Sequence, residues 1–149
     1  MLRQWLLIAC FFGGIGGAAA QLGPGWERTF ELTDRQFEAG MVHRSRTIGY
    51  DTNQVYPQPE FRPQVDSIAA FLLTRPRLFV RVQPGNDQLT EARAKWLMEY
   101  WVDYGIAQKR LTTGAPVGRE TPAARSAGVE FPELVLTVVR VWEPDTLQR

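Results

Sequence analysis

The chain has 149 residues, of which 44% are hydrophobic and 22% charged, and its 17 basic side chains nearly balance its 16 acidic ones. This length fits one domain with a sizeable core and is short for two. The balanced charge, with no run of like charges, argues against a nucleic-acid-binding protein and against a polybasic membrane patch.

Residues 1–20 have the order of features of a secretory signal peptide: Arg3, an apolar run from Trp5, and three alanines before Gln21. We therefore expect cleavage after Ala20 and export of the remaining chain. A retained membrane anchor is the competing interpretation. The uncharged stretch is shorter than the roughly 20 residues that a spanning helix needs, and it contains four glycines.

A second interpretation of the N-terminus involves Cys10. Leu7 to Cys10 reads as a bacterial lipobox, in which the cysteine is acylated and becomes the mature N-terminus. Its early position and the apolar residues that follow it argue against lipidation. If Cys10 is removed with the signal peptide, the mature chain has no cysteine and therefore no disulfide.

Residues 21–47 form an N-terminal extension that begins with the flexible sequence QLGPG. Partial alternation in WERTFEL and clearer alternation in MVHRSRTIGY, with Val42, Ile48 and Tyr50 apolar, predict the first, half-exposed strand or strands.

The next two elements are a helix and a strand. Apolar residues fall on one face of a helix predicted from about Glu60 to Thr74, which ends before Pro76; they are Phe61, Val65, Ile68 and Leu72. Alternating Leu78, Val80 and Val82 predict a strand that ends at Pro84 and Gly85.

A second helix is predicted from Thr90, with Gly105 as its left-handed C-terminal cap. Its core face comprises Ala94, Leu97, Trp101 and Tyr104. Trp96 and Tyr100 lie toward other faces, where either the N-terminal segment or a partner protein would cover them.

The C-terminal part contains a Gly/Pro-rich segment from Thr112 to Pro132, which we interpret as a long loop, and an apolar strand from Leu134 to Trp142. The order strand, helix, strand, helix, strand predicts an α+β two-layer sandwich, with a βαβαβ-type mixed sheet and two helices on one face. Residues 144–149 form a C-terminal tail.

Three pieces of residues 48–143 resemble the OmpA-like C-terminal domain, the peptidoglycan-associating module of bacterial outer-membrane proteins, lipoproteins and motor stators. They are IGYDTNQV, FRPQVDSIAAFLLTRPRLFVRV and LTEARAKWLMEYWVDYGIAQKRL. The third piece is the most specific, because nine of its residues stand at the family's spacing: Leu89, Thr90, Arg93, Ala94, Tyr100, Gly105, Ile106, Arg110 and Leu111.

The resemblance implies a ligand site around Arg93, with Asn86, Asp87 and Thr90 as further candidates. In the family, an aspartate and the arginine of this helix hold the diamino acid of the peptidoglycan stem peptide. A zwitterionic head needs an acceptor for its ammonium and a bidentate donor for its carboxylate. The alternative is that Arg93 is a solvated residue on the first turn of a helix.

The chain departs from the family's pattern at two places. The loop QPGNDQ is several residues shorter than the family's, so the aspartate is either deleted or replaced by Asp87, and Asp87 is otherwise an ordinary loop or cap residue. The chain has Glu130 to Glu133 where the family has paired arginines. The fold is therefore expected to persist while the ligand site is eroded.

Other chemistry has little support. His43 is the only histidine and is expected at the surface or at a strand edge, and no set of residues suggests a metal site or a catalytic site. We expect no cofactor. The carboxylate pairs Glu31 with Asp34 and Glu99 with Asp103 are expected on solvated faces.

These observations predict a non-catalytic protein of the periplasm or of the periplasmic face of the outer membrane. Its expected function is that of a structural or interaction component, with other envelope proteins of a multiprotein complex as partners. The alternative function is a peptidoglycan-binding anchor that recognises the stem-peptide diamino acid.

Overall fold

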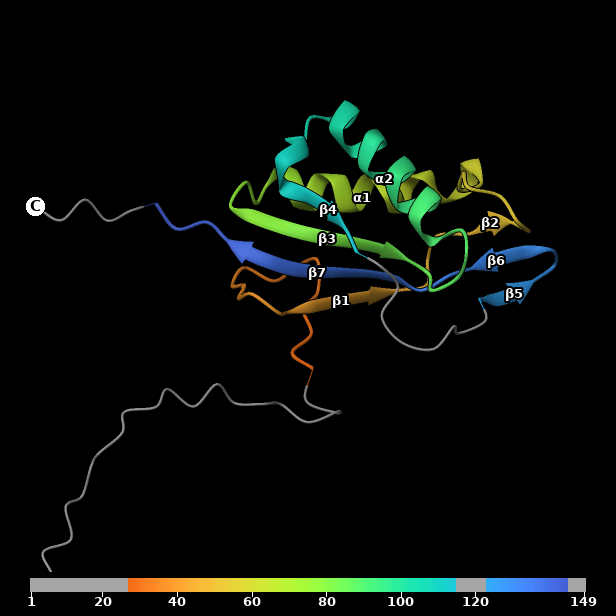
Figure 1. Ribbon diagram of the computed structural model, residues 1–149, viewed down its shortest axis with the longest axis horizontal. Coiled ribbons are helices and arrows are strands. Elements are labelled where there is room, and N and C mark those ends of the chain that lie inside the picture. The colour runs from red at the N-terminus through yellow and green to blue at the C-terminus, as the bar shows by residue number, and fades with distance from the viewer. Residues whose placement is uncertain (1–26, 115–122, 145–149) are drawn as a thin grey trace, which may run out of the picture.

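The computed structural model describes residues 27–114 and 123–144 (Figure 1). The expected signal peptide, its cleavage site before Gln21, and Cys10 lie outside the described residues.

Two helices, α1 (Arg62–Leu73) and α2 (Thr90–Tyr104), lie side by side on one face of a four-stranded sheet (Figure 1). The strand order is β1-β7-β3-β4. Strands β3 and β4 are parallel, whereas β7 is antiparallel to both β1 and β3. The strands are β1 (Val42–Ser45), β3 (Leu78–Pro84), β4 (Leu111–Thr113) and β7 (Leu134–Val141). This arrangement confirms the predicted α+β class, mixed sheet and placement of the helices.

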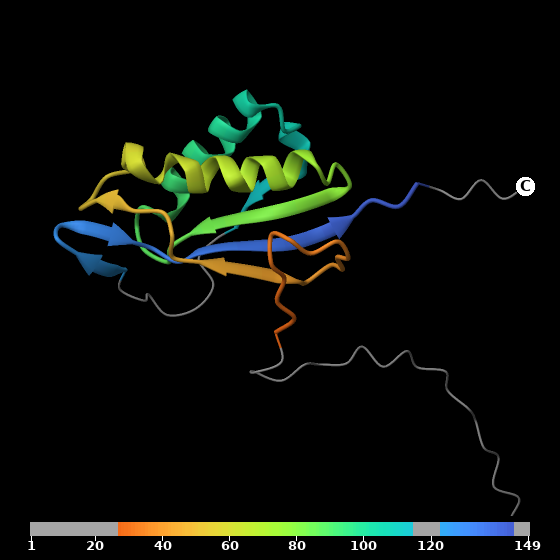
Figure 2. The same ribbon diagram turned by 180° about the vertical axis from the view of Figure 1, so that it is seen from behind.

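A second, three-stranded antiparallel sheet has the order β2-β6-β5. It lies beyond the end of β3, next to the start of α2 (Figures 1 and 2). Its strands are β2 (Tyr50–Asp51), β5 (Ala124–Ser126) and β6 (Val129–Phe131), and the short 3-10 helices η1 (Pro59–Phe61) and η2 (Gln108–Arg110) complete the described elements.

The strands sharpen one prediction and correct another. The stretch from Met41 to Tyr50, predicted to hold the first strand or strands, contributes β1 to the main sheet and β2 to the small one. The interpretation of Thr112 to Pro132 as a long loop was wrong in part, since this segment overlaps β4 and contains the β5–β6 hairpin. These strands have only three residues each, too few to produce a readable alternation among loop residues.

The core lies between the helices and the main sheet. The predicted inward faces of α1 and α2 are confirmed for Val65, Ile68, Leu72, Ala94, Leu97 and Trp101, all of which are buried. Tyr104 was wrongly assigned to the core, as it is 43% exposed. The chain reverses at Gly105, the predicted left-handed cap with a φ of +118°, and Ile106 after it is buried.

His43 lies on edge strand β1, which confirms the expected strand-edge position, but it is buried and not at the surface. Residues preceding β1 fold back over this edge, and the Phe30 carbonyl oxygen lies 3.1 Å from His43 Nδ1. The Phe30 ring stacks on Phe71 of α1, with the ring centroids 5.7 Å apart. The N-terminal segment therefore extends the core at the β1 edge.

Among the described residues, Trp96 and Tyr100 pack against α1, and the Tyr56 ring also lies edge-on to Trp96, with the centroids 6.0 Å apart. Their rings stack with centroids 5.2 Å apart, and the Arg62 guanidinium lies over both rings. The Tyr100 hydroxyl donates a hydrogen bond of 2.7 Å to Asp66. Contacts with α1 and with Tyr56 thus surround these aromatic side chains.

Within residues 27–114 and 123–144, neither helix has the length and apolar character that crossing a membrane requires.

Candidate functional site

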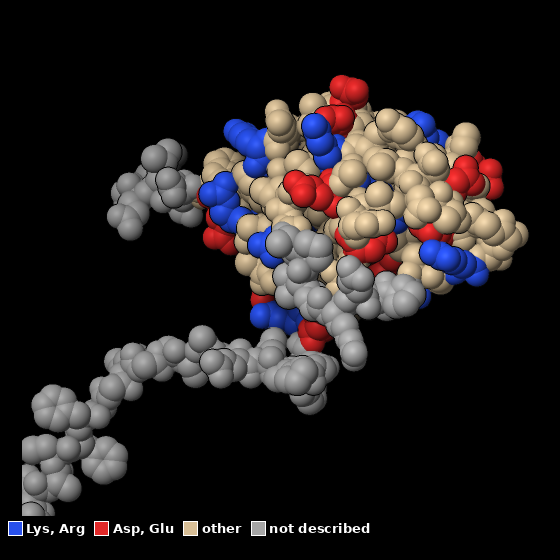
Figure 3. All heavy atoms as spheres, turned by 45° about the vertical axis from the view of Figure 1, so that its right-hand side comes forward, with Lys and Arg blue, Asp and Glu red and all other residues tan. Residues whose placement is uncertain are grey.

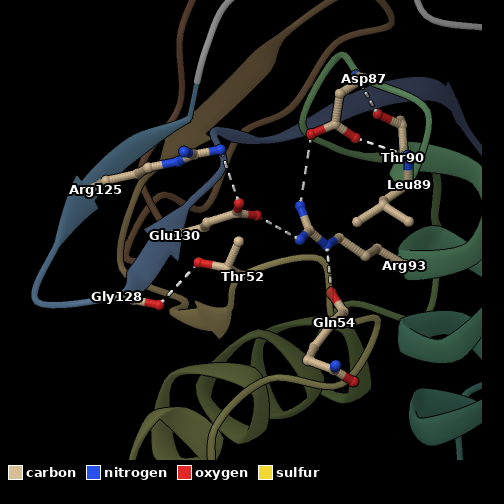
Figure 4. Close-up of polar contacts among 9 residues, drawn as sticks. All are labelled: Thr52, Gln54, Asp87, Leu89, Thr90, Arg93, Arg125, Gly128 and Glu130. Atoms are coloured by element: carbon tan, nitrogen blue, oxygen red, sulfur yellow. Dashed lines mark hydrogen bonds and ion pairs between the residues drawn. The ribbon is translucent and has the colours of Figure 1, made fainter.

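The site that the sequence predicts around Arg93 lies where α2 begins, facing the small sheet (Figure 4). A tight loop after β3 turns at Gly85, whose φ is +90°, and leads into the first turn of α2. The Arg93 side chain is 0% exposed and lies over the Tyr50 ring, 4.5 Å from its centroid. The interpretation of Arg93 as a solvated helix residue was therefore wrong.

Three acceptors surround the Arg93 guanidinium. Nε donates to the Gln54 carbonyl oxygen at 3.0 Å, and Nη2 donates to Glu130 Oε2 at 2.9 Å. Nη1 lies 3.7 Å from Asp87 Oδ2 and makes no hydrogen bond to a described residue. Two carboxylates thus face one buried cation, which compensates for much of the cost of removing these charges from water.

Asp87 combines the two roles that the sequence left open. Its Oδ1 accepts a hydrogen bond of 2.8 Å from the Leu89 N–H, and its own N–H donates to Thr90 Oγ1 at 2.9 Å. These bonds order the start of α2, as those of a helix cap do. At the same time its Oδ2 faces Arg93.

The structure brings together only part of the predicted site. Arg93 and Asp87 meet, whereas Thr90 is 1% exposed and its hydroxyl is engaged by the Asp87 backbone. Asn86 is half-buried in the same loop. Thr90 therefore acts in loop structure and presents no free surface to a ligand.

Glu130 is the residue that sequence reasoning missed. It lies on β6, is 3% exposed, and binds Arg93 with one oxygen while its other oxygen accepts a hydrogen bond of 3.1 Å from Arg125 on β5. The sequence carried one signal, because Glu130 opens the segment that replaces the family's paired arginines. Its pairing with Arg93 could not be foreseen while β5 and β6 were interpreted as loop.

A cavity of about 330 Å³ opens beside this cluster. Its lining consists of Asn53, Asp87, Gln88, Leu89, Arg125 and Glu130. Arg93 does not line the cavity, because it lies behind the two carboxylates. A ligand entering here therefore meets carboxylate oxygens and the exposed Arg125 before it can reach Arg93.

Tyr50, whose ring lies beneath the Arg93 guanidinium, is uncharged. Burial raises the pKa of the Tyr50 hydroxyl, and the nearby Arg93 charge opposes that shift only in part. The hydroxyl is protonated at neutral pH and has no hydrogen-bond partner among the described residues. Tyr50 thus supports the guanidinium through its ring and adds no charge of its own.

The face shown in Figure 3 intersperses acidic and basic side chains over a largely uncharged surface. Within the described parts of the chain, no group of three or more His, Cys, Asp or Glu side chains is arranged to hold a metal ion.

Comparison of the chain with protein-family profiles finds no match. Comparison with curated protein sequences finds none either.

Solved structures do match the chain. The periplasmic domain of Helicobacter pylori MotB aligns with a TM-score of 0.54 and 15% sequence identity, over 70% of this chain and 76% of that one. Another structure of a MotB periplasmic domain gives a TM-score of 0.51 and 16% identity, over 69% of this chain and 66% of that one. The chain therefore has the fold of MotB periplasmic domains, which is the OmpA-like fold that the sequence predicted.

Proposed function

We propose that this chain is a non-catalytic structural or interaction component of a periplasmic or outer-membrane assembly, in which its own Glu130 closes the Arg93 site. The supporting observation is the buried ion pair between Arg93 and Glu130, whose atoms are 2.9 Å apart. The periplasmic origin of the matched MotB domains supports the proposed location.

The ion pair explains why stem-peptide binding would be weak. A ligand carboxylate would compete with Glu130 for the same Nη2 donor. Glu130, which is only 3% exposed, would then keep its buried charge without the contact to Arg93. Separating a buried pair in this way costs about 3 to 5 kcal/mol, and about 1.4 kcal/mol corresponds to a tenfold change in affinity. Glu130 would therefore reduce binding by at least about a hundredfold.

One observation favours the second candidate, a peptidoglycan-binding anchor. Asp87 Oδ2 lies 3.7 Å from Arg93 Nη1, and this nitrogen has no hydrogen bond to a described residue. An acceptor and a donor for a zwitterionic head are thus adjacent. The anchor would require Glu130 to leave Arg93, since Glu130 occupies the remaining donor.

Co-sedimentation with purified sacculi distinguishes the two functions. We expect the wild type and Arg93→Ala to bind equally poorly, while Glu130→Ala, which frees Arg93, gains binding that Glu130→Ala/Arg93→Ala loses. Lys95→Ala serves as a control for a charge change on the exposed face of the same helix. Circular dichroism must show that every variant is folded.

Strong binding by the wild type that disappears in both Arg93→Ala and Asp87→Ala would overturn the proposal and establish the anchor. In that case Arg93→Lys should also lose most of the binding, because an ammonium cannot reproduce the planar guanidinium fork.

Export is tested separately. Mass spectrometry of the protein isolated from its cells should find Gln21 at the N-terminus, because the three alanines before it form a signal-peptidase site. An acylated Cys10 at the N-terminus would instead make the protein a lipoprotein.

A further inference from the structure

The two edges of the main sheet differ in how they are covered. At the β1 edge, the Phe30 N–H donates to the Val42 carbonyl oxygen at 3.0 Å, and the Val42 N–H donates to the Arg28 carbonyl oxygen at 2.9 Å. At the opposite edge, β4 pairs with β3 on one side, and no described strand pairs with its other side. An unpaired strand edge is a template for another chain.

A groove of about 380 Å³ lies beside the open β4 edge, between β4 and the outer face of α2. Half-buried Met98 and Val102 supply its apolar surface, and Thr113 of β4 belongs to its lining. A strand added to β4 would place every second side chain beneath this face of α2, because successive side chains of a strand point to opposite faces. The groove and the open edge therefore form one surface, which we call the β4 groove.

The rim of the β4 groove is acidic. Glu91, Glu99 and Asp103 line it, and Lys95, the only basic residue among those lining it, lies 3.9 Å from Glu99. Exposed edges are commonly protected by a lysine or a proline, yet the exposed positions of β4 are threonines. Neither a charge nor a missing N–H on these threonines opposes pairing.

We propose that the β4 groove binds an extended segment of a partner protein, which joins the sheet next to β4 and alternates apolar with Lys or Arg side chains. Apolar side chains would contact Met98 and Val102, and the cationic ones would face the acidic rim. Main-chain bonds supply affinity and side-chain contacts supply specificity in this mode of recognition. The proposal does not depend on whether the Arg93 site binds peptidoglycan.

Because β4 is short, the side chains of the bound segment must contribute much of the affinity and specificity. A strand of three residues offers only a few outward backbone groups, so most discrimination between segments must come from the apolar floor and the acidic rim. Reversing one rim charge should therefore weaken binding strongly.

Selection from a library of linear random peptides displayed on phage, with the full chain as bait, tests the proposal. We expect enrichment of segments that alternate apolar and basic residues. In fluorescence anisotropy, the best enriched peptide, made synthetically, should bind Glu99→Lys at least tenfold more weakly than wild type. Glu60→Lys, an exposed charge reversal on η1, is the matched control and should leave binding unchanged.

Hydrogen exchange gives a second readout. The enriched peptide should slow amide exchange in Leu111–Thr113, as added backbone pairing requires. Val102→Asp tests the contribution of the apolar floor of the β4 groove to peptide binding. If Val102→Asp fails to fold, Glu99→Lys still tests the proposal. Failure to enrich any peptide over an unrelated bait, equal binding to Glu99→Lys and wild type, or protection confined to other strands would each overturn the proposal.

Discussion

Two buried arginines, Arg93 and Arg110, lie toward opposite ends of this molecule, and their hydrogen-bond acceptors are of different kinds. Arg93 lies where α2 begins and faces two carboxylates, Glu130 and Asp87. Arg110 lies in η2 at the other end, where its acceptors among the described residues are backbone carbonyl oxygens, including those of Leu72 and Leu78 at 2.8 and 2.9 Å. Both arginines stand at positions that match the OmpA-like pattern, yet only one has an ionisable environment.

The difference separates an arginine whose partners are fixed by the fold from one whose partners can vary. The carbonyls around Arg110 follow from the end of α1 and the start of β3, so this contact is fixed by the fold, and the positive charge suits the C-terminal end of a helix. Burial lowers the pKa of Arg110, because desolvation penalises its charged form. The partners of Arg93 are side chains from a loop and a hairpin, which substitution can change without altering the fold.

Removing Arg93 should have the largest effect. Arg93→Met should lower the free energy of unfolding by about 3 to 5 kcal/mol at neutral pH, because Glu130 stays buried without its main partner. Urea denaturation at neutral pH measures this. Lys95→Met is the exposed control, and a loss no larger than that of this control would contradict the role of Glu130.

Leu97, which lies on α2 one turn after Arg93, calibrates the charged contacts against an apolar one. Leu97→Ala should cost about 2 to 5 kcal/mol, because this fully buried side chain would leave a cavity. Lys95→Ala should change stability by no more than about 0.5 kcal/mol. Thermal and urea unfolding measure both variants, and equal, small effects would show that the core face of α2 is assigned wrongly.

Removing Arg110 should cost less than removing Arg93. Arg110→Met should lower the free energy of unfolding by about 1 to 3 kcal/mol. Its acceptors keep other donors, since the Arg75 N–H donates to the Leu72 oxygen and the Leu78 N–H donates to the Arg75 oxygen. Urea denaturation at neutral pH measures this loss. A loss exceeding that of Arg93→Met would invert the comparison.

The smallest effect is expected at Tyr100, where the charged contact lies between α1 and α2. Tyr100→Phe should cost about 0.5 to 1.5 kcal/mol, because it removes the hydrogen bond to Asp66. That bond raises the pKa of Tyr100. Its contribution is therefore complete below the ordinary tyrosine pKa of about 10 and is lost as the pH rises through the higher pKa of the folded protein.

Unfolding of the wild type and of Tyr100→Phe between neutral pH and about pH 11 measures this contribution. The stability difference between the two proteins should narrow only at the alkaline end. A difference that already narrows near neutral pH would show that another group controls the contact.

The sequence predicted the parts of the fold that have long, regular patterns. Periodicity located α1, α2, β3 and β7, and Gly105 marked the end of α2 because a left-handed residue is required there. The three-residue strands β4, β5 and β6 were not predicted, because tertiary pairing and not local sequence pattern defines them.

Only half of the site was predicted, again because local sequence pattern does not reveal pairing between distant parts of the chain. Arg93 and Asp87 are near each other in sequence, so the resemblance could place them together. Glu130 is 37 residues away from Arg93 along the chain, on a hairpin that the sequence did not reveal. A buried arginine on the first turn of a helix has no local signature, because its burial depends on what the distant chain brings over it.

The position of β7 has a consequence for how the protein is made. This last described strand lies between β1 and β3 in the sheet, so its Leu136 pairs with His43 on one side and with Val82 on the other. Until β7 has been synthesised, β1 has no neighbour in the main sheet, and such distant pairings form slowly. A growing chain therefore cannot complete its main sheet until β7 has been synthesised, even though β3 and β4 can pair earlier.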